Sequence, residues 1–282
     1  MATFTIMRLT FLEAARRRIA LAAVLLGVAF LVLYAIALYF LVNRTGLPPA
    51  DNPANNLMRS QVFNFLSLSG MYAVNFLGIA LGALVSADTL AGEISSGTIQ
   101  SVVTKPVRRA EVVLGKWLGF AVLLAAYMGM MIGGVVVIVY LQAHYLMPNL
   151  WSGLALIYLG SLVIMSLTLA CSSSFSTLAT GGAVFGLWGV AFIGGFVEQV
   201  GALLRNTAVV NIGILSSLIL PTEAVFRRAA YMMSSATAQT LGFSSGPMFV
   251  ASVPSPFMST YAAVYLLALL GLAIWRFGKR DL

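Results

Sequence analysis

The chain has 282 residues, of which 60% are hydrophobic and only 9% are charged. A soluble globular domain carries roughly a quarter charged residues, so this composition excludes one and indicates an integral membrane protein. The net charge of +8 does not indicate a nucleic-acid partner, because the basic residues flank apolar runs, as membrane topology requires.

The first element, residues 1–18, places Phe4, Met7, Phe11 and Leu12 near one helical face. This pattern predicts a helix lying on the inner membrane surface with its apolar side down. The alternative is a polar lead-in that extends the first span. The basic run Arg16–Arg18 imitates a signal peptide, but the apolar run 19–41 that follows has 23 residues, longer than a secretory core of about 7–15. We therefore expect a retained first span.

About 20 apolar residues cross a bilayer as a helix, which satisfies its own backbone groups in lipid. Six runs meet this requirement and predict an all-α, polytopic fold with a single membrane domain, residues 1–282: Ile19–Leu41, Gln61–Ser86, Val112–Leu141, Leu150–Cys171, Leu178–Val200 and Thr260–Phe277. The outer loop 43–60, which contains three prolines, is expected to be irregular.

The external region 201–259 contains one further apolar run, Thr207–Leu220, of 14 residues. This run is too short for an ordinary span and predicts an interfacial or re-entrant helix on the outer side. Pro221 is expected to end it.

An even number of spans puts both termini on one side of the membrane, which we assign to the cytoplasm. We expect the protein in the plasma (inner) membrane. Positive charge concentrates on the cytoplasmic side of membrane proteins. The inner side then holds eleven basic residues: Arg8, Arg16, Arg17, Arg18, Lys105, Arg108, Arg109, Lys116, Arg276, Lys279 and Arg280. The outer side holds five: Arg44, Arg59, Arg205, Arg227 and Arg228. This excess of basic residues on the inner side favours an orientation with both termini in the cytoplasm.

Three spans carry the Gly-xxx-Gly spacing that lets membrane helices approach closely: Gly78/Gly82, Gly129/Gly133 and Gly182/Gly186. The fifth span adds Gly181, Gly189, Gly194 and Gly195. We expect this glycine-rich span to form an interface inside one subunit, with a dimer seam as the alternative.

Catalytic and metal-binding patterns are missing from the sequence. His144, the single histidine, is placed in an outer loop, whereas the serines Ser172–Ser174 are on the inner side, which argues against a Ser–His triad. The lone Cys171 and the methionines Met128, Met130 and Met131 are expected to serve packing. No phosphate-binding loop occurs, and no ionisable residue is expected at a span centre, so a proton relay is not predicted. The energy source must lie elsewhere.

The stretch 88–116 between spans two and three holds seven of the 24 charged residues: Asp88, Glu93, Lys105, Arg108, Arg109, Glu111 and Lys116. Gly97 permits a tight reversal, residues 98–104 can form one or two helical turns, and Pro106 suits the first turn of the next helix. Glu93 is positioned to pair with Arg109 or Lys116. These features predict a shaped cytoplasmic loop, residues 87–111, presented to a soluble partner.

Three elements of this stretch resemble the pattern that ABC transporter permeases of the type-2 exporter class carry between spans two and three: Glu93-x-x-x-Gly97-Thr98, Pro106-x-x-Arg109 and Gly115-Lys116. The layout of a basic lead-in, six spans and an outer re-entrant region is similar too. The resemblance implies that a short coupling helix near Thr98–Val103 seats in a cleft on an ATPase. It assigns coupling roles to six residues: Glu93, Gly97, Thr98, Pro106, Arg109 and Lys116.

The resemblance further implies a dimer with a second permease copy or paralogue and two separate ATPase subunits. Those subunits would bind ATP and Mg²⁺, while this chain holds no cofactor or metal and is not an enzyme by itself. Two other readings remain open. One is a membrane enzyme or maturation factor, and the other is a non-transporting anchor that recruits an ATPase for signalling or envelope work. The apolar spans fit lipid-like, peptide or hydrophobic drug cargo equally.

Overall fold

The computed structural model describes residues 2–44, 52–95, 108–235 and 252–279, and every regular element in these ranges is a helix. Six helices are long and apolar enough to cross a membrane: α2 (Arg18–Arg44), α3 (Pro53–Ser95), α5 (Arg109–Ala143), α6 (Leu150–Ser172), α7 (Thr177–Leu203) and α11 (Phe257–Lys279). The predicted all-α polytopic fold is confirmed.

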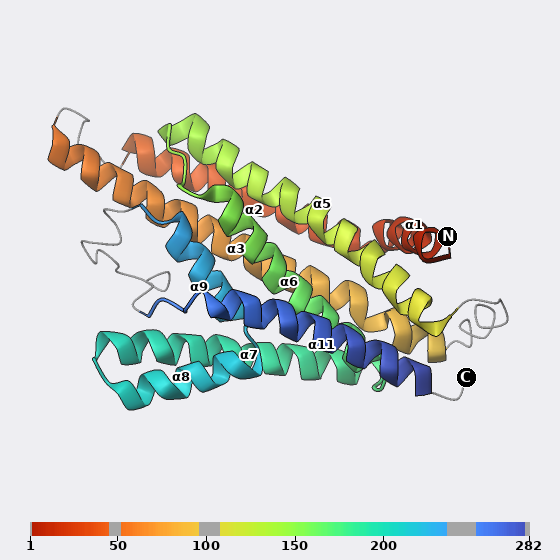
Figure 1. The fold of residues 1–282 in the computed structure, drawn as a ribbon. Coiled ribbons are helices and arrows are strands. Elements are labelled where there is room, and N and C mark those ends of the chain that lie inside the picture. The colour runs from red at the N-terminus through yellow and green to blue at the C-terminus, as the bar shows by residue number, and fades with distance from the viewer. Residues whose placement is uncertain (1, 45–51, 96–107, 236–251, 280–282) are drawn as a thin grey trace.

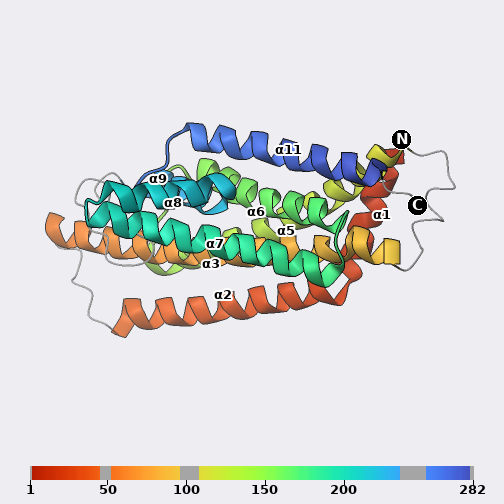
Figure 2. The same cartoon turned by 90° about the horizontal axis from the view of Figure 1, so that it is seen from below.

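The six spanning helices run side by side as one bundle (Figure 1). Both termini, the end of α3 and the start of α5 lie at one end of this bundle, which we call the proximal end; the opposite end is the distal end. The N-terminal helix α1 (Ala2–Arg16) is separated from α2 at Arg17 and lies across the proximal end, steeply inclined to the spans (Figure 2). It packs against α5.

The prediction that residues 43–60 form an irregular loop is wrong at both ends of this range. Helix α2 continues to Arg44, and α3 already begins at Pro53. The backbone N–H of Asn55 donates to Oδ1 of Asn52 at 2.8 Å, which caps the first turn of α3. Proline suits that turn because its missing N–H would have no partner there. Residues 45–51 lie outside the described ranges.

The apolar run after α7 forms a bent helix pair. Helix α8 (Thr207–Ile219) runs back along α7, and α9 (Thr222–Met233) follows at an angle of 108°. The backbone of Gly153, at the distal start of α6, faces Met233, whereas Gly160, halfway along α6, faces the carbonyl of Thr222. The pair therefore enters the bundle from the distal end and returns toward it, with Pro221 at the bend, as a re-entrant segment does. Helix α9 was not predicted.

Close packing of α3, α5 and α6 explains one predicted glycine pair. A Cβ atom on Gly78 would collide with the Met128 side chain and lie 3.0 Å from the Ser161 hydroxyl. One on Gly82 would lie 3.4 Å from the Ser161 carbonyl oxygen. Met128 and Met131 are buried in the same core, so both serve packing.

The other glycines divide into two groups. Gly194 abuts Ser216, and Gly195 abuts Glu223, so the expected interface inside the chain is right for the distal part of α7. A Cβ atom on any glycine of the proximal part would meet nothing within 4 Å: Gly181, Gly182, Gly186 and Gly189. Gly129 and Gly133 are equally open. For the proximal part of α7 the expected interface inside the chain is wrong, because no described helix covers these glycines.

Candidate functional site

Three of the six predicted coupling residues lie outside what the structure describes, and a fourth is described only in its backbone. Gly97, Thr98 and Pro106 fall in residues 96–107, and so does the predicted coupling helix near 98–103. The backbone of Glu93 belongs to the last turn of α3, but its side chain is not described. The structure places both flanking helix ends at the proximal end, and these ends carry the site's geometry.

Arg109 begins α5 directly after this loop. Its Nη1 donates to the carbonyl oxygen of Gly278 at 3.0 Å, in the last turn of α11. The same helix start is capped by Glu111, whose carboxylate accepts the backbone N–H of Arg108 at 3.2 Å. An acidic side chain in the first turn also complements the helix dipole. The loop base is thereby fixed to the C-terminal span.

Lys116 lies two turns further along α5 and is only 7% exposed. Its Nζ is 3.5 Å from the carbonyl oxygen of Thr89, near the proximal end of α3. This contact joins the two helices that flank the loop. The predicted pairing of Glu93 with Arg109 or Lys116 involves an undescribed side chain and stays a prediction.

Asp88 connects the end of α3 to two further elements. One carboxylate oxygen accepts the Thr177 hydroxyl at 3.0 Å, at the first residue of α7. The other lies 3.6 Å from Nη1 of Arg17, at the break between α1 and α2. Arg17 also pairs with Glu13 of α1 at 2.7 Å. Asp88 thus contacts both the α1–α2 junction and the start of α7.

Two glycines of α5 allow helix α1 to pack closely against the bundle. A Cβ atom on Gly115 would lie 2.8 Å from the Ile6 side chain, and one on Gly119 would lie 2.8 Å from the Met7 carbonyl oxygen. Neither contact leaves room for a side chain, so the backbones of α1 and α5 touch. Gly115 belongs to the Gly-Lys element of the sequence pattern. Its structural role is this helix crossing.

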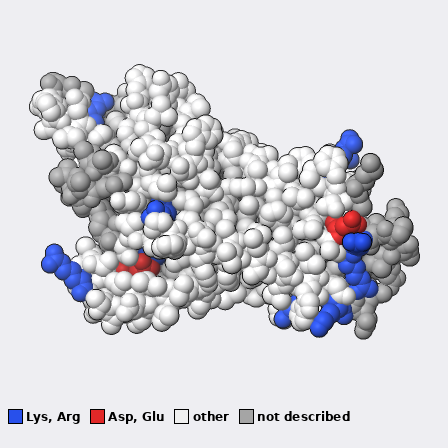
Figure 3. All heavy atoms as spheres, in the orientation of Figure 1, with Lys and Arg blue, Asp and Glu red and all other residues white. Residues whose placement is uncertain are grey.

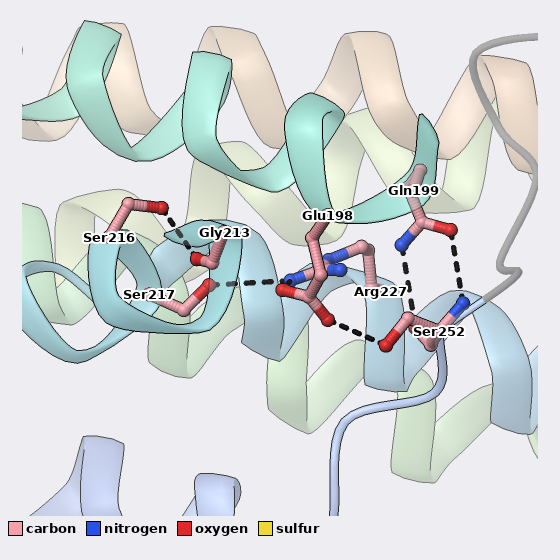
Figure 4. A network of polar contacts seen from close by, with 7 residues as sticks. All are labelled: Glu198, Gln199, Gly213, Ser216, Ser217, Arg227 and Ser252. Atoms are coloured by element: carbon pink, nitrogen blue, oxygen red, sulfur yellow. Dashed lines mark hydrogen bonds and ion pairs between the residues drawn. The ribbon is translucent and has the colours of Figure 1, made fainter. Parts of the chain in front are cut away.

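A second polar network lies toward the distal end, between α7, α8, α9 and the chain before α11 (Figure 4). Glu198 and Arg227 form a buried ion pair at 2.7 Å, with side chains only 4% and 5% exposed. Ser252 donates its hydroxyl to Glu198 at 2.7 Å, and Gln199 bonds both backbone groups of Ser252. Arg227 also donates to the Ser217 hydroxyl at 3.3 Å.

The sequence interpretation missed both Asp88 and the distal network. Asp88 was recognised as part of the charged stretch, but nothing in the sequence points to Thr177 as its partner. Arg227 was counted only as an outer basic residue. The available signal was that acidic and basic residues occur together in 222–228. Such residues need partners if they are buried.

Six spanning helices, a crossing N-terminal helix and a re-entrant pair define a polytopic membrane subunit with no soluble domain in its described ranges. The chain belongs to the ABC-2 transporter family: the model described as ABC-2 family transporter protein matches residues 4–282. It is accordingly a membrane-spanning permease subunit of an ABC transporter, a class that associates with ABC ATPase subunits. A comparison with curated proteins gave no match.

Proposed function

We propose that this permease belongs to an ATP-driven exporter in which two separate ATPase subunits dock on residues 88–116 from the cytoplasm. ATP and Mg²⁺ would be bound by those subunits. The observation that carries the proposal is that both helix ends flanking the loop bond to other elements: Asp88 of α3 contacts the α1–α2 junction and α7, and Arg109 of α5 contacts α11. A partner that moves the loop therefore acts on most of the bundle.

The proposed orientation puts the proximal end, with both termini, in the cytoplasm. Figure 3 shows a dense group of Lys and Arg side chains around that end of the molecule. They come from several helix ends, including Arg16 of α1, Arg109 of α5 and Arg276 and Lys279 of α11. This distribution supports the orientation, because positive charge stays on the cytoplasmic side.

The proposed coupling is a rigid-body movement of packed helices. ATP binding would draw the two ATPases together and displace the loop between α3 and α5. Asp88 would carry that displacement to the start of α7, and Arg109 would carry it to α11. A ligand shifts a conformational equilibrium only through contacts that differ between the two states. In this proposal the polar contacts of Asp88 and Arg109, which water can replace, would be the ones that differ between the two states.

We also propose that a second permease copy covers the open part of α7. A Cβ atom on any glycine in 181–189 would meet nothing within 4 Å among the described residues, and flanking apolar side chains such as Leu178 and Val190 are 89% and 50% exposed. Glycine stretches allow close helix approach in lipid, where packing drives association. The same surface could face only lipid, and cross-linking separates the two outcomes.

Reconstitution tests the proposed function directly. The permease and its partner ATPase are placed in liposomes, and ATP-dependent movement of lipid-like, peptide and hydrophobic drug probes across the bilayer is measured. Movement that needs both subunits and ATP supports an exporter. ATP hydrolysis that the permease stimulates without movement of any probe would instead favour the non-transporting anchor.

A further inference from the structure

Glu223 is a buried carboxylate that neither the coupling site nor the ion pair uses. It sits in the first turn of α9 and is only 8% exposed. A Cβ atom on Gly195 would lie 2.6 Å from its Cγ, so the side chain is pressed against α7. Oε1 accepts the Tyr72 hydroxyl at a long 3.5 Å. Oε2 has no hydrogen-bond partner within the described residues.

The charges around Glu223 do not balance. Arg227, one helical turn away, is already paired with Glu198 at 2.7 Å. One guanidinium therefore has to serve two carboxylates, and it forms an ion pair only with Glu198, while its Nε and Nη1 have no hydrogen-bond partner within the described residues. Moving one unpaired charge out of water is costly enough that buried acids neutralise instead. The helix dipole at the start of α9 favours a carboxylate only weakly and does not offset that cost.

Among the described residues, no other cation pairs with Glu223. Helices α3, α6, α7, α8 and α11 pack against α9. The titratable or charged groups that these elements and α9 itself present nearby are Tyr72, Glu198, Arg227, Arg228, Tyr261 and Tyr265. Arg228 donates to the Pro254 carbonyl at 3.0 Å, and the two α11 tyrosines donate to carbonyls at the end of α8. The stretches 45–51 and 236–251, which lie outside the described ranges, contain no Lys, Arg or His.

We propose that Glu223 is a proton-binding site and carries one proton in this conformation. A metal ion would need more ligands, and the described residues contain no group of three His, Cys, Asp or Glu side chains that could hold one. A proton requires no cavity. It leaves Glu198 and Arg227 as a balanced pair and turns Glu223 into a neutral acid against the backbone of Gly195.

The proton also has a consequence for transport, which rests on the proposed function. If α7 and α9 separate when the distal end opens, Glu223 meets water, loses its proton and becomes charged. Closing the bundle requires that the proton be bound again. One proton is thus taken up and released in each cycle, and alkaline conditions oppose the closed conformation.

Infrared spectroscopy of the resting, detergent-purified permease tests the site without any transport. The carbonyl stretch of a protonated carboxylic acid is well separated from that of a carboxylate. We expect this band in the wild type at neutral pH and its complete loss in Glu223→Gln, which has nearly the same shape. Glu111→Gln, a matched change at a half-exposed position, should leave the band unchanged. A band that survives in Glu223→Gln overturns the proposal.

Thermal unfolding measured against pH provides the second readout. Above about pH 4.3 Glu223 is ionised in the unfolded state, so the folded state holds one proton more and stability falls as the pH rises, until the folded protein also releases the proton. Glu223→Gln should remove this decline, whereas Glu111→Gln should retain it. Equal slopes in the wild type and Glu223→Gln would contradict the proton site. If both tests support it while reconstituted transport fails, the proposed function is wrong and the proton site stands.

Discussion

The carboxylate of Asp88 accepts a hydrogen bond from the Thr177 hydroxyl at 3.0 Å, although 89 residues separate the two positions in the chain. The contact joins the helix that enters the charged loop to the first turn of α7. Because Arg17 lies on the other oxygen of the same carboxylate, the position has both a hydrogen-bonding and a charge role, which substitutions can separate.

Asp88→Asn tests the charge role. Asparagine retains an oxygen that accepts the Thr177 hydroxyl, but it loses the attraction to Arg17. A partly exposed pair is worth about 0–1 kcal/mol, so we expect a small change in thermal stability. ATP-driven transport should fall several-fold if the pair transmits movement. Thr177→Val removes the hydrogen bond and Thr177→Ser keeps it, so transport should fall in the first and persist in the second.

Gly119→Val should displace helix α1. Its side chain would begin 2.8 Å from the backbone oxygen of Met7, which cannot move without moving α1. Overpacking of this kind costs about 1–3 kcal/mol, seen as a lower unfolding temperature and faster proteolysis of α1. Gly133→Val is the matched control on the same helix, because nothing lies within 4 Å of that position. Equal effects of both variants would rule out the crossing contact.

Arg227→Met should destabilise the distal end strongly. Removing one partner of a buried ion pair leaves the other charge unpaired and costs about 3–5 kcal/mol. The double variant Glu198→Leu with Arg227→Met removes both charges and should recover most of the loss. Thermal unfolding of the two single variants and the double variant forms a mutant cycle. Additive losses would show that the pair is not coupled.

Gly97→Val and Glu93→Arg test the sequence pattern of the coupling loop. Both should lower ATPase stimulation and export several-fold while membrane insertion stays unchanged, because they alter the docking surface and not the spans. Gly271→Val serves as a control for expression, since a Cβ atom there meets nothing within 4 Å. Normal export by both loop variants at equal expression would argue against the docking role.

Gly186→Cys tests the second permease copy. In a background where Cys171 is replaced by Ala, a single cysteine on the open part of α7 should form a disulfide between two copies in membranes. Cysteine at Gly129, another open position on a different helix, is the comparison. If neither cysteine forms a cross-link, lipid and not a second copy covers the open part of α7.

Hydropathy alone was enough to predict the six spans, because each must bury about 20 apolar residues in lipid. It failed where contacts between distant residues decide the structure. The position of α1 depends on the contacts of Gly115 and Gly119 with Ile6 and Met7. No local sequence pattern predicts such a helix crossing.

Helix α9 was missed for a related reason. Its sequence contains Glu223, Arg227 and Arg228 and resembles a polar outer loop, yet the helix is largely buried. Arg227 is tolerated there because Glu198 neutralises it, and Glu198 comes from another helix. Composition identifies an ionisable residue but not its partner, so burial of such residues follows only from the fold.

Helix α3 runs unbroken for 43 residues, which at about 1.5 Å per residue makes a rod of roughly 65 Å. The hydrocarbon layer it crosses is only about 30 Å thick. Such a rod must protrude well beyond the lipid, and a tilt imposed at one tip displaces the other in the opposite direction. In the proposed coupling, α3 would act as a lever that tilts about the part held in the lipid.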